Sequence, residues 1–226
     1  MNIINFIGGE KGGVGKSVVS RLLAQYYIDN HISFIGYDTD RSHNTFLRFY
    51  ENFASPTTVD KYESLDAIFE NLDPDAENRI IVDLAAQTKL PLLKWMDESA
   101  VMEITEDMGI SLKFWHVLDD SKDSTELLAS LIDKFQDRLS YVIVKNYGRG
   151  SDFKIFESSN IIPKNLKADI IEIKSLHDTT MQKIDEQNMS FWAAINNKNN
   201  GLGVFEKQRI KTWVKHAFNE FASIGV

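Results

Sequence analysis

The chain has 226 residues, a net charge of −8 and no cysteine. The length suits one large α/β domain or two small ones, and the lack of cysteine excludes disulfides, thiolate metal sites and a cysteine nucleophile. The acidic net charge argues against a generic nucleic-acid-binding protein.

Apolar strand-like segments alternate with helical segments along the chain. In chain order the expected strands are 2–9, 32–38, 79–85, 111–119, 139–146 and 168–176, and the expected helices are 17–30, 59–72, 89–109, 123–138, 181–197 and 203–224. This alternation is typical of parallel βαβ units. It predicts an α/β fold with an open, mainly parallel twisted sheet and helices on both faces. No repeat or linker divides the chain, so we expect residues 1–226 to form a single domain.

The glycine-dense stretch "GGEKGGVGKSVVS" follows the first expected strand and opens the first expected helix. It resembles a P-loop, in which backbone N–H groups and the helix N-terminus surround phosphate oxygens. In that pattern Lys16 reaches the β- and γ-phosphates and Ser17 places its hydroxyl on Mg²⁺. Glu10 stands where the strict pattern has glycine, and we expect its acidic side chain to face away from the phosphates. The alternative is a tight strand-to-helix turn without a ligand.

Two more expected strands end in acidic residues. Asp38 and Asp40 follow the second strand in "GYDTDRSHN", and Asp83 ends the third in "RIIVDLAAQ". Ligands of such sheets lie beyond the carboxyl ends of the strands, so these carboxylates are expected beside the glycine turn. Without the glycine turn, Asp38 and Asp40 would be equally well explained as turn residues.

The segment "KGGVGKS" resembles the deviant Walker A motif of the ParA/MinD superfamily of P-loop ATPases. The resemblance implies a P-loop NTPase fold, ATP and Mg²⁺ as cofactors, and an ATP-dependent homodimer. It implies that Lys16 acts within its own subunit and that Lys11 reaches the ATP of the partner. The implied nucleotide-binding residues are Lys11, Gly12, Gly13, Val14, Gly15, Lys16, Ser17, Val18 and Asn146.

The segment "GYDTDRSHNT" is similar to the family's D-x-D-P-Q-x-N motif, with Arg41 and Ser42 in place of proline and glutamine. The resemblance implies that Asp38 lies near Mg²⁺ and that Asp40 orients the attacking water. "RIIVDLAAQ" looks like a Walker B motif in which Asp83 holds Mg²⁺ through a water. The implied catalytic residues are Lys11, Lys16 and Asp40, and the implied metal-site residues are Ser17, Asp38 and Asp83.

Asn146 ends the expected strand "LSYVIVKN". Related proteins commonly use an asparagine at this place to hydrogen-bond adenine, and a turn-forming asparagine is an equal alternative.

The charge is unevenly distributed. Residues 1–144 have a net charge of −11, whereas residues 145–226 have a net charge of +3. The basic residues considered for DNA contact are Lys174, Lys183, Lys198, Lys207, Arg209, Lys211 and Lys215. The simpler explanation for each is a solvated surface. The last helix could also act as a basic membrane helix, but its large apolar face favours packing on the sheet.

The function that these patterns and the resemblance together favour is ATP-driven positioning or segregation of DNA. ATP hydrolysis would be slow and stimulated by a small adaptor or activator protein. The location expected is the bacterial cytoplasm, with the gene on a plasmid or mobile element. The alternatives are an accessory ATPase of conjugative transfer, mobilisation or envelope-machine assembly, and a MinD-like ATPase at the membrane. A dinucleotide- or metal-cofactor enzyme is disfavoured, because the glycine spacing is not G-x-G-x-x-G and cysteine is absent.

Overall fold

Seven parallel strands form one sheet in the computed structural model, which describes residues 2–72 and 77–226. The strands are β1 (Asn2–Gly8), β2 (Ile35–Asp38), β3 (Ala54–Pro56), β4 (Arg79–Asp83), β5 (Ile110–Leu118), β6 (Ser140–Asn146) and β7 (Ala168–Ile173). Their order in the sheet is β3-β2-β4-β1-β5-β6-β7, and every described strand pairing is parallel. The expected fold class is confirmed.

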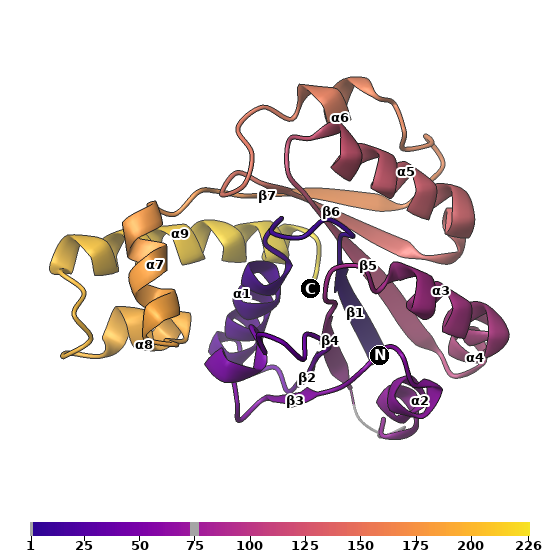
Figure 1. The fold of residues 1–226 in the computed structure, drawn as a ribbon, viewed down its shortest axis with the longest axis horizontal. Coiled ribbons are helices and arrows are strands. Elements are labelled where there is room, and N and C mark those ends of the chain that lie inside the picture. Colours follow the sequence, from indigo (N-terminus) through magenta and orange to yellow (C-terminus); the bar gives the residue numbers. More distant parts are fainter. Residues whose placement is uncertain (1, 73–76) are drawn as a thin grey trace.

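Helices cover both faces of the sheet (Figure 1). They are α1 (Lys16–Asp29), α2 (Tyr62–Glu70), α3 (Lys89–Glu98), α4 (Val101–Asp107), α5 (Lys122–Phe135), α6 (Lys154–Ser158), α7 (Asp178–Glu186), α8 (Phe191–Asn196) and α9 (Val204–Ser223), with 3₁₀ turns η1 (Leu47–Phe49) and η2 (Gln136–Arg138). α1 and α9 lie on one face, and α2 to α6 lie on the other. α7, α8 and the start of α9 extend away from the sheet (Figure 1). Within the described residues, no helix combines the length and the hydropathy needed to cross a bilayer.

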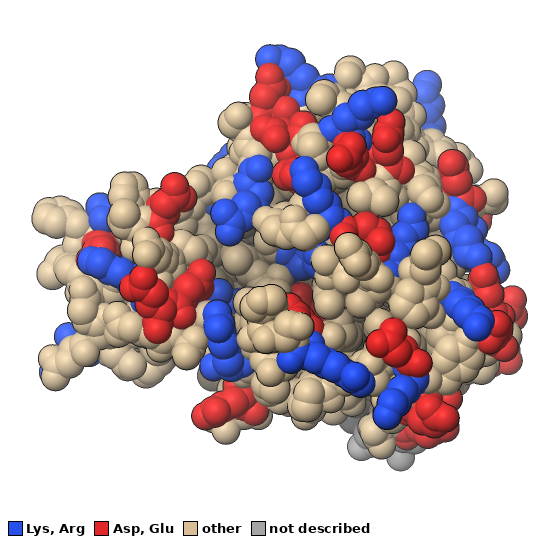
Figure 2. Space-filling model, in the orientation of Figure 1, with Lys and Arg blue, Asp and Glu red and all other residues tan. Residues whose placement is uncertain are grey.

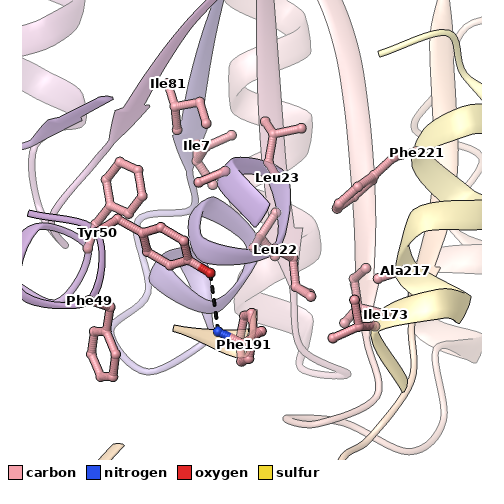
Figure 3. Packing of buried hydrophobic residues seen from close by; sticks show 14 of the residues in the cluster. Ile7, Leu22, Leu23, Phe49, Tyr50, Ile81, Ile173, Phe191, Ala217 and Phe221 are labelled. Carbon is pink, nitrogen blue, oxygen red and sulfur yellow. Dashed lines mark hydrogen bonds between the residues drawn. The ribbon is translucent and has the colours of Figure 1, made fainter. Parts of the chain in front are cut away.

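Each face of the sheet has its own hydrophobic core. Inward side chains of α1 and α9 pack on one face, with side chains of α8 packed against these two helices, and those of α2, α3 and α5 pack on the other face. Figure 3 shows the first core, where Leu22 and Leu23 of α1 face Phe221 and Ala217 of α9. The apolar face of the last helix is therefore buried inside the protein, as its pattern favours.

Most expected elements are present, and the differences are local. The helix expected over 89–109 is two helices, because Ala100 takes a left-handed conformation with φ of 47°. The helix expected over 181–197 is also two helices, separated by Asn188 with φ of 49° and restarted by Ser190, whose hydroxyl caps α8. The short elements β3 and α6 were not expected, because three to five residues carry no measurable periodicity.

Candidate nucleotide-binding site

The register of the sheet places the predicted site residues at one edge. Asp38 of β2 pairs with Asp83 of β4, and Asp83 pairs with Ile7 of β1 just before the glycine turn. On the other side of β1, Gly8 pairs with His116 of β5. The carboxyl ends of the central strands therefore surround the P-loop, which we define as residues 8–17.

The P-loop has the backbone shape that phosphate binding requires. Gly13 has φ of 80° and Gly15 has φ of 99°, a left-handed conformation that favours glycine. The backbone N–H groups of Gly12, Gly13 and Gly15 have no acceptor within the described part of the chain. They are adjacent to the N-terminus of α1, so the loop offers several donors beside the positive end of a helix.

Lys16 begins α1 and is only 7% exposed. Its Nζ donates to the backbone oxygen of Lys11 at 3.0 Å. Burial lowers the pKa of Lys16, whereas the charges of Asp83, Glu10 and Asp40 raise it. Lys16 therefore lies across the loop, surrounded by acidic groups, and its ammonium has further donors for an incoming phosphate.

Asp83 at the end of β4 is almost fully buried. Burial raises its pKa to about 7, and the charge of Asp38 acts in the same direction. Hydrogen bonds from Ser17 and Ser20 oppose this change, and the Ser20 hydroxyl lies 2.9 Å from Oδ1 of Asp83. A carboxylate with so little solvent is well suited to stabilisation by a cation.

Asp38 organises the loop after β2. Its Oδ1 accepts from the backbone N–H of Asp40 at 2.9 Å, and its Oδ2 accepts from those of Phe46 and Leu47 at 2.8 and 2.9 Å. Asp38 thus holds the loop that carries Asp40, and its proximity to Mg²⁺ stays a prediction.

Asp40 is more accessible and closes a turn of the same loop. Its Oδ1 accepts from the backbone N–H groups of Ser42 and His43 at 3.0 and 3.2 Å. The carboxylate is nevertheless close enough to Lys16 to raise the pKa of that lysine. Asp40 is therefore placed near the P-loop by its own turn, with its role toward water still a prediction.

Lys11 is engaged within its own chain. Its Nζ lies 2.6 Å from Oδ2 of Asp119 and 3.0 Å from the Ser121 hydroxyl, at the junction of β5 and α5. The side chain keeps 38% exposure. The predicted reach of Lys11 to a partner's nucleotide would require it to leave these groups.

Asn146 at the end of β6 supports the loop. Its Nδ2 donates to the backbone oxygen of Val14 at 2.7 Å, and its Oδ1 accepts from the N–H of Gly148 at 3.0 Å. A Cβ at Gly15 would lie 2.2 Å from Nδ2 of Asn146, so this contact requires glycine there. Both amide groups of Asn146 are used by the backbone, which matches the turn-forming alternative; an adenine contact stays a prediction.

The residues present fit ATP and Mg²⁺. Unpartnered loop amides and Lys16 suit the phosphates, while Ser17 and Asp83 suit the metal. Within the described residues, no group of three or more histidine, aspartate or glutamate side chains is arranged to hold a metal by itself. Mg²⁺ in nucleotide sites commonly uses one or two carboxylates, phosphate oxygens and water, so Asp83 with Ser17 would be sufficient.

The sequence analysis did not identify three residues beside the P-loop, which are Asp119, Ser121 and Ser124. Asp119 follows β5 and accepts from the hydroxyls of Ser121 and Ser124 at 2.5 and 2.6 Å, in addition to Lys11. The signal was present, because Asp119 is another acidic residue at a strand end. The rule that found Asp38 and Asp83 applies equally to it.

No protein-family model matches the chain. Two curated relatives, both named Protein TraL and both from Escherichia coli, are 23% identical over 234 and 236 residues, which is 96% of this chain and 95% of each relative. A solved putative plasmid partition protein from Borrelia burgdorferi B31, bound to AMPPNP, has a TM-score of 0.56 at 15% identity and covers 99% of both chains. The septum site-determining protein MinD from Pyrococcus horikoshii, complexed with Mg-ADP, has a TM-score of 0.48 at 15% identity over 94% of this chain and 96% of that chain.

The likeness to the partition protein extends over the whole sheet and its helices, beyond the motif in which the resemblance was first seen. The chain therefore has the fold of this partition protein, in agreement with the P-loop NTPase fold that its deviant Walker A motif predicts.

Proposed function

We propose that this protein is an ATPase that dimerises when it binds ATP and Mg²⁺, and that slow hydrolysis to ADP and phosphate returns it to monomers. The observation that carries the proposal is the pair of lysines on one P-loop. Lys16 lies across the loop, and Lys11 extends outward to a partly exposed ion pair. A lysine side chain that can leave its ion pair within its own subunit can neutralise phosphate charge in a partner's site, and this interaction would favour the dimer.

The carboxylates at the same sheet edge support hydrolysis. Phosphoryl transfer depends mainly on positioning and charge neutralisation, for which the site offers Asp83 and Ser17 for Mg²⁺ and Asp40 for a water. Asp38 would act in the same site by holding the loop that carries Asp40. Ground-state binding and turnover would thus use different residues, so variants can separate them.

The output we propose is positioning or segregation of DNA in the bacterial cytoplasm, with a small adaptor or activator protein that stimulates hydrolysis. The solved protein with the same fold is described as a putative plasmid partition protein, which favours this output. The DNA contact would use exposed lysines of α9, since Lys174 and Lys183 are already paired with Glu172 and Glu206. Figure 2 shows acidic and basic side chains interspersed over the visible face, so any such contact would be weak and salt-sensitive.

A second candidate output is assistance in conjugative transfer, where the dimer would present a surface to other proteins. Both curated relatives carry the name TraL, which hints at transfer. The two candidates share the ATP-driven dimer and differ only in what the dimer binds.

One experiment tests both the ATP-driven dimer and its binding to DNA. The sedimentation of the full chain is measured with ATP and Mg²⁺, with ADP and Mg²⁺, and without nucleotide, and retention of random-sequence DNA is measured in parallel at low and high salt. Of these three conditions, we expect dimers only with ATP and Mg²⁺. We expect DNA retention to require ATP and to disappear at high salt. A monomer under all conditions would contradict the ATP-driven dimer. An ATP-driven dimer that retains no DNA at low salt would exclude segregation and favour the transfer output.

A further inference from the structure

Glu10 connects the P-loop to a distant helix. Its Oε1 accepts a hydrogen bond from the backbone N–H of Lys89 at 2.7 Å, across 79 positions of sequence. Lys89 is the first residue of α3. The residue that replaces the glycine of the strict P-loop pattern therefore binds the N-terminus of a helix; its orientation relative to the phosphates stays a prediction.

α3 lacks the usual groups at its N-terminus. The N-cap residue Thr88 makes no capping bond, and its hydroxyl donates to the backbone oxygen of Ala85 at 2.8 Å. The first turn of α3 contains no acidic residue, whereas the first turns of α2, α5, α7 and α9 each contain one. An acceptor and a negative charge both stabilise a helix N-terminus. In α3, the P-loop supplies both through Glu10.

The segment between Asp83 and α3 is fixed at both ends. At its start, the Thr39 hydroxyl accepts from the N–H of Ala85 at 2.8 Å and donates to the backbone oxygen of Asp83 at 3.0 Å. At its end, Glu10 holds Lys89. Residues 84–88 therefore join the predicted metal-site carboxylate to α3 while being tied to the P-loop.

The contact of Lys16 lies one residue from Glu10. Lys16 donates to the carbonyl of Lys11, and a phosphate that engages the Lys16 ammonium would compete with this carbonyl. That carbonyl belongs to the residue that directly follows Glu10. The charge of Glu10 also helps to keep Lys16 protonated, against the effect of burial.

We propose that Glu10 is a positioning residue that couples the nucleotide state of the P-loop to residues 84–88 and the start of α3. The inference rests on the proposed ATP-dependent function and adds the path by which the bound state reaches a helix outside the site. It also explains why glutamate is useful at a position that is glycine in the strict motif.

Hydrogen exchange of the Lys89 amide tests the proposal, because that N–H makes the bond in question. Exchange is measured on the full chain with and without AMPPNP and Mg²⁺, together with the dissociation constant of AMPPNP. The variants are Glu10→Ala, which removes the acceptor, and Glu10→Gln, which keeps an acceptor oxygen without the charge. Ser190→Ala is the matched control, since Ser190 caps α8 without any contact to the P-loop in the described structure.

In the wild type we expect slow exchange of the Lys89 amide that slows further, by about threefold, when AMPPNP binds. Glu10→Ala should exchange about tenfold faster without nucleotide and show no further slowing at AMPPNP concentrations that saturate this variant, as judged from its own dissociation constant. Glu10→Gln should retain the response, and Ser190→Ala should behave like the wild type at Lys89.

The coupling role would be overturned if AMPPNP slowed exchange of the Lys89 amide in Glu10→Ala as it does in the wild type. It would also be overturned if this slowing were lost in all three variants, Glu10→Ala, Glu10→Gln and Ser190→Ala. A wild type that binds AMPPNP without any change at Lys89 would overturn it too. A wild type that binds no AMPPNP would contradict the proposed function itself, and the dissociation constant distinguishes that outcome from the others.

Discussion

Lys11 and Asp119 form an ion pair, with 2.6 Å between Nζ and Oδ2, that joins the P-loop to the end of β5. Partial burial raises the pKa of Asp119, but hydrogen bonds from Lys11, Ser121 and Ser124 outweigh burial and lower it to about 2. The carboxylate is therefore ionised at neutral pH, and its hydrogen bond raises the pKa of Lys11. In the single chain, the lysine proposed to act on a partner is retained by its own subunit.

Weakening this ion pair should favour the dimer. Asp119→Asn keeps an acceptor for the two serine hydroxyls but removes the charge that holds Lys11. Because exposed ion pairs contribute little, we expect the dissociation constant of the ATP-bound dimer to fall by only about two- to fivefold, measured by sedimentation equilibrium. Asp120→Asn is the charge-matched control: the adjacent Asp120 accepts from the N–H of Ser151 and acts on Lys11 only through its charge, without a hydrogen bond or ion pair to it among the described residues, so its effect on the dimer should be smaller. A dimer that is weakened by Asp119→Asn would indicate that Asp119 itself serves the interface.

The two P-loop lysines should have separable effects. Lys16→Ala removes the buried cation that faces the phosphate site, so we expect it to abolish nucleotide binding in a fluorescence or calorimetric titration. Lys11→Ala should bind nucleotide nearly normally and lose dimerisation or hydrolysis. Normal dimerisation and turnover by Lys11→Ala would show that Lys11 has no role in the partner's site.

Asp40 should affect turnover more than binding. Alanine at this position is expected to trap an ATP-bound dimer, but it also removes the acceptor for Ser42 and His43. Asp40→Asn keeps that acceptor and removes the charge that would orient water. We expect both variants to dimerise with ATP and to hydrolyse it at least about tenfold more slowly, measured as phosphate release. Normal phosphate release by Asp40→Asn would exclude a role for the carboxylate charge, and a defect confined to Asp40→Ala would assign the residue to the turn.

Much of the fold could be predicted from the sequence, because its main elements carry strong local signals. The apolar strands, the glycine turn and the long amphipathic helix α5 were all expected. Periodicity could not predict where two expected helices are interrupted. The left-handed residues Ala100 and Asn188 lie inside helical patterns that continue on both sides. Backbone conformation at such positions depends on tertiary packing, which a pattern of apolar residues does not contain.

The sequence identified most residues of the candidate site, but it did not predict which side chains contact each other. Residues at the strand ends were identified because parallel strands bring their carboxyl ends together. The partners of Lys11 and Glu10 lie 108 and 79 residues away, and no local rule connects such distant positions. Asn146 was predicted as either an adenine contact or a turn residue; in the structure it supports the backbone at Val14 and Gly148, and the adenine contact stays a prediction.

DNA retention, if it is the output, should depend on α9. Lys211 and Lys215 are exposed and four residues apart, so they lie on one face of the helix, away from the buried apolar residues. Replacing both by glutamate should reduce DNA retention at low salt by more than about tenfold, while ATP-dependent dimerisation is unchanged. Lys164→Glu, in an exposed loop, is the charge-matched control. Equal retention by the double variant and the wild type would remove α9 from the DNA contact.

His116 should make stability depend on pH. It is buried in β5 beside Gly8, its Nε2 lies 3.2 Å from the backbone oxygen of Ser124, and burial lowers its pKa to about 4, assisted by the charges of Lys89 and Lys16. In the unfolded chain histidine titrates near its ordinary pKa of about 6.5.

Between about pH 4 and 6.5 the unfolded chain therefore binds a proton that the folded chain does not. The contribution of His116 to the free energy of unfolding is fully present above pH 6.5 and declines as the pH falls through this window. We expect the wild type to lose roughly 3 kcal/mol between pH 7 and pH 4 relative to His116→Gln, measured by urea denaturation of both proteins. Parallel stability profiles for the two proteins would show that His116 is protonated as readily in the folded chain as in the unfolded one, which its burial beside two lysines makes unfavourable.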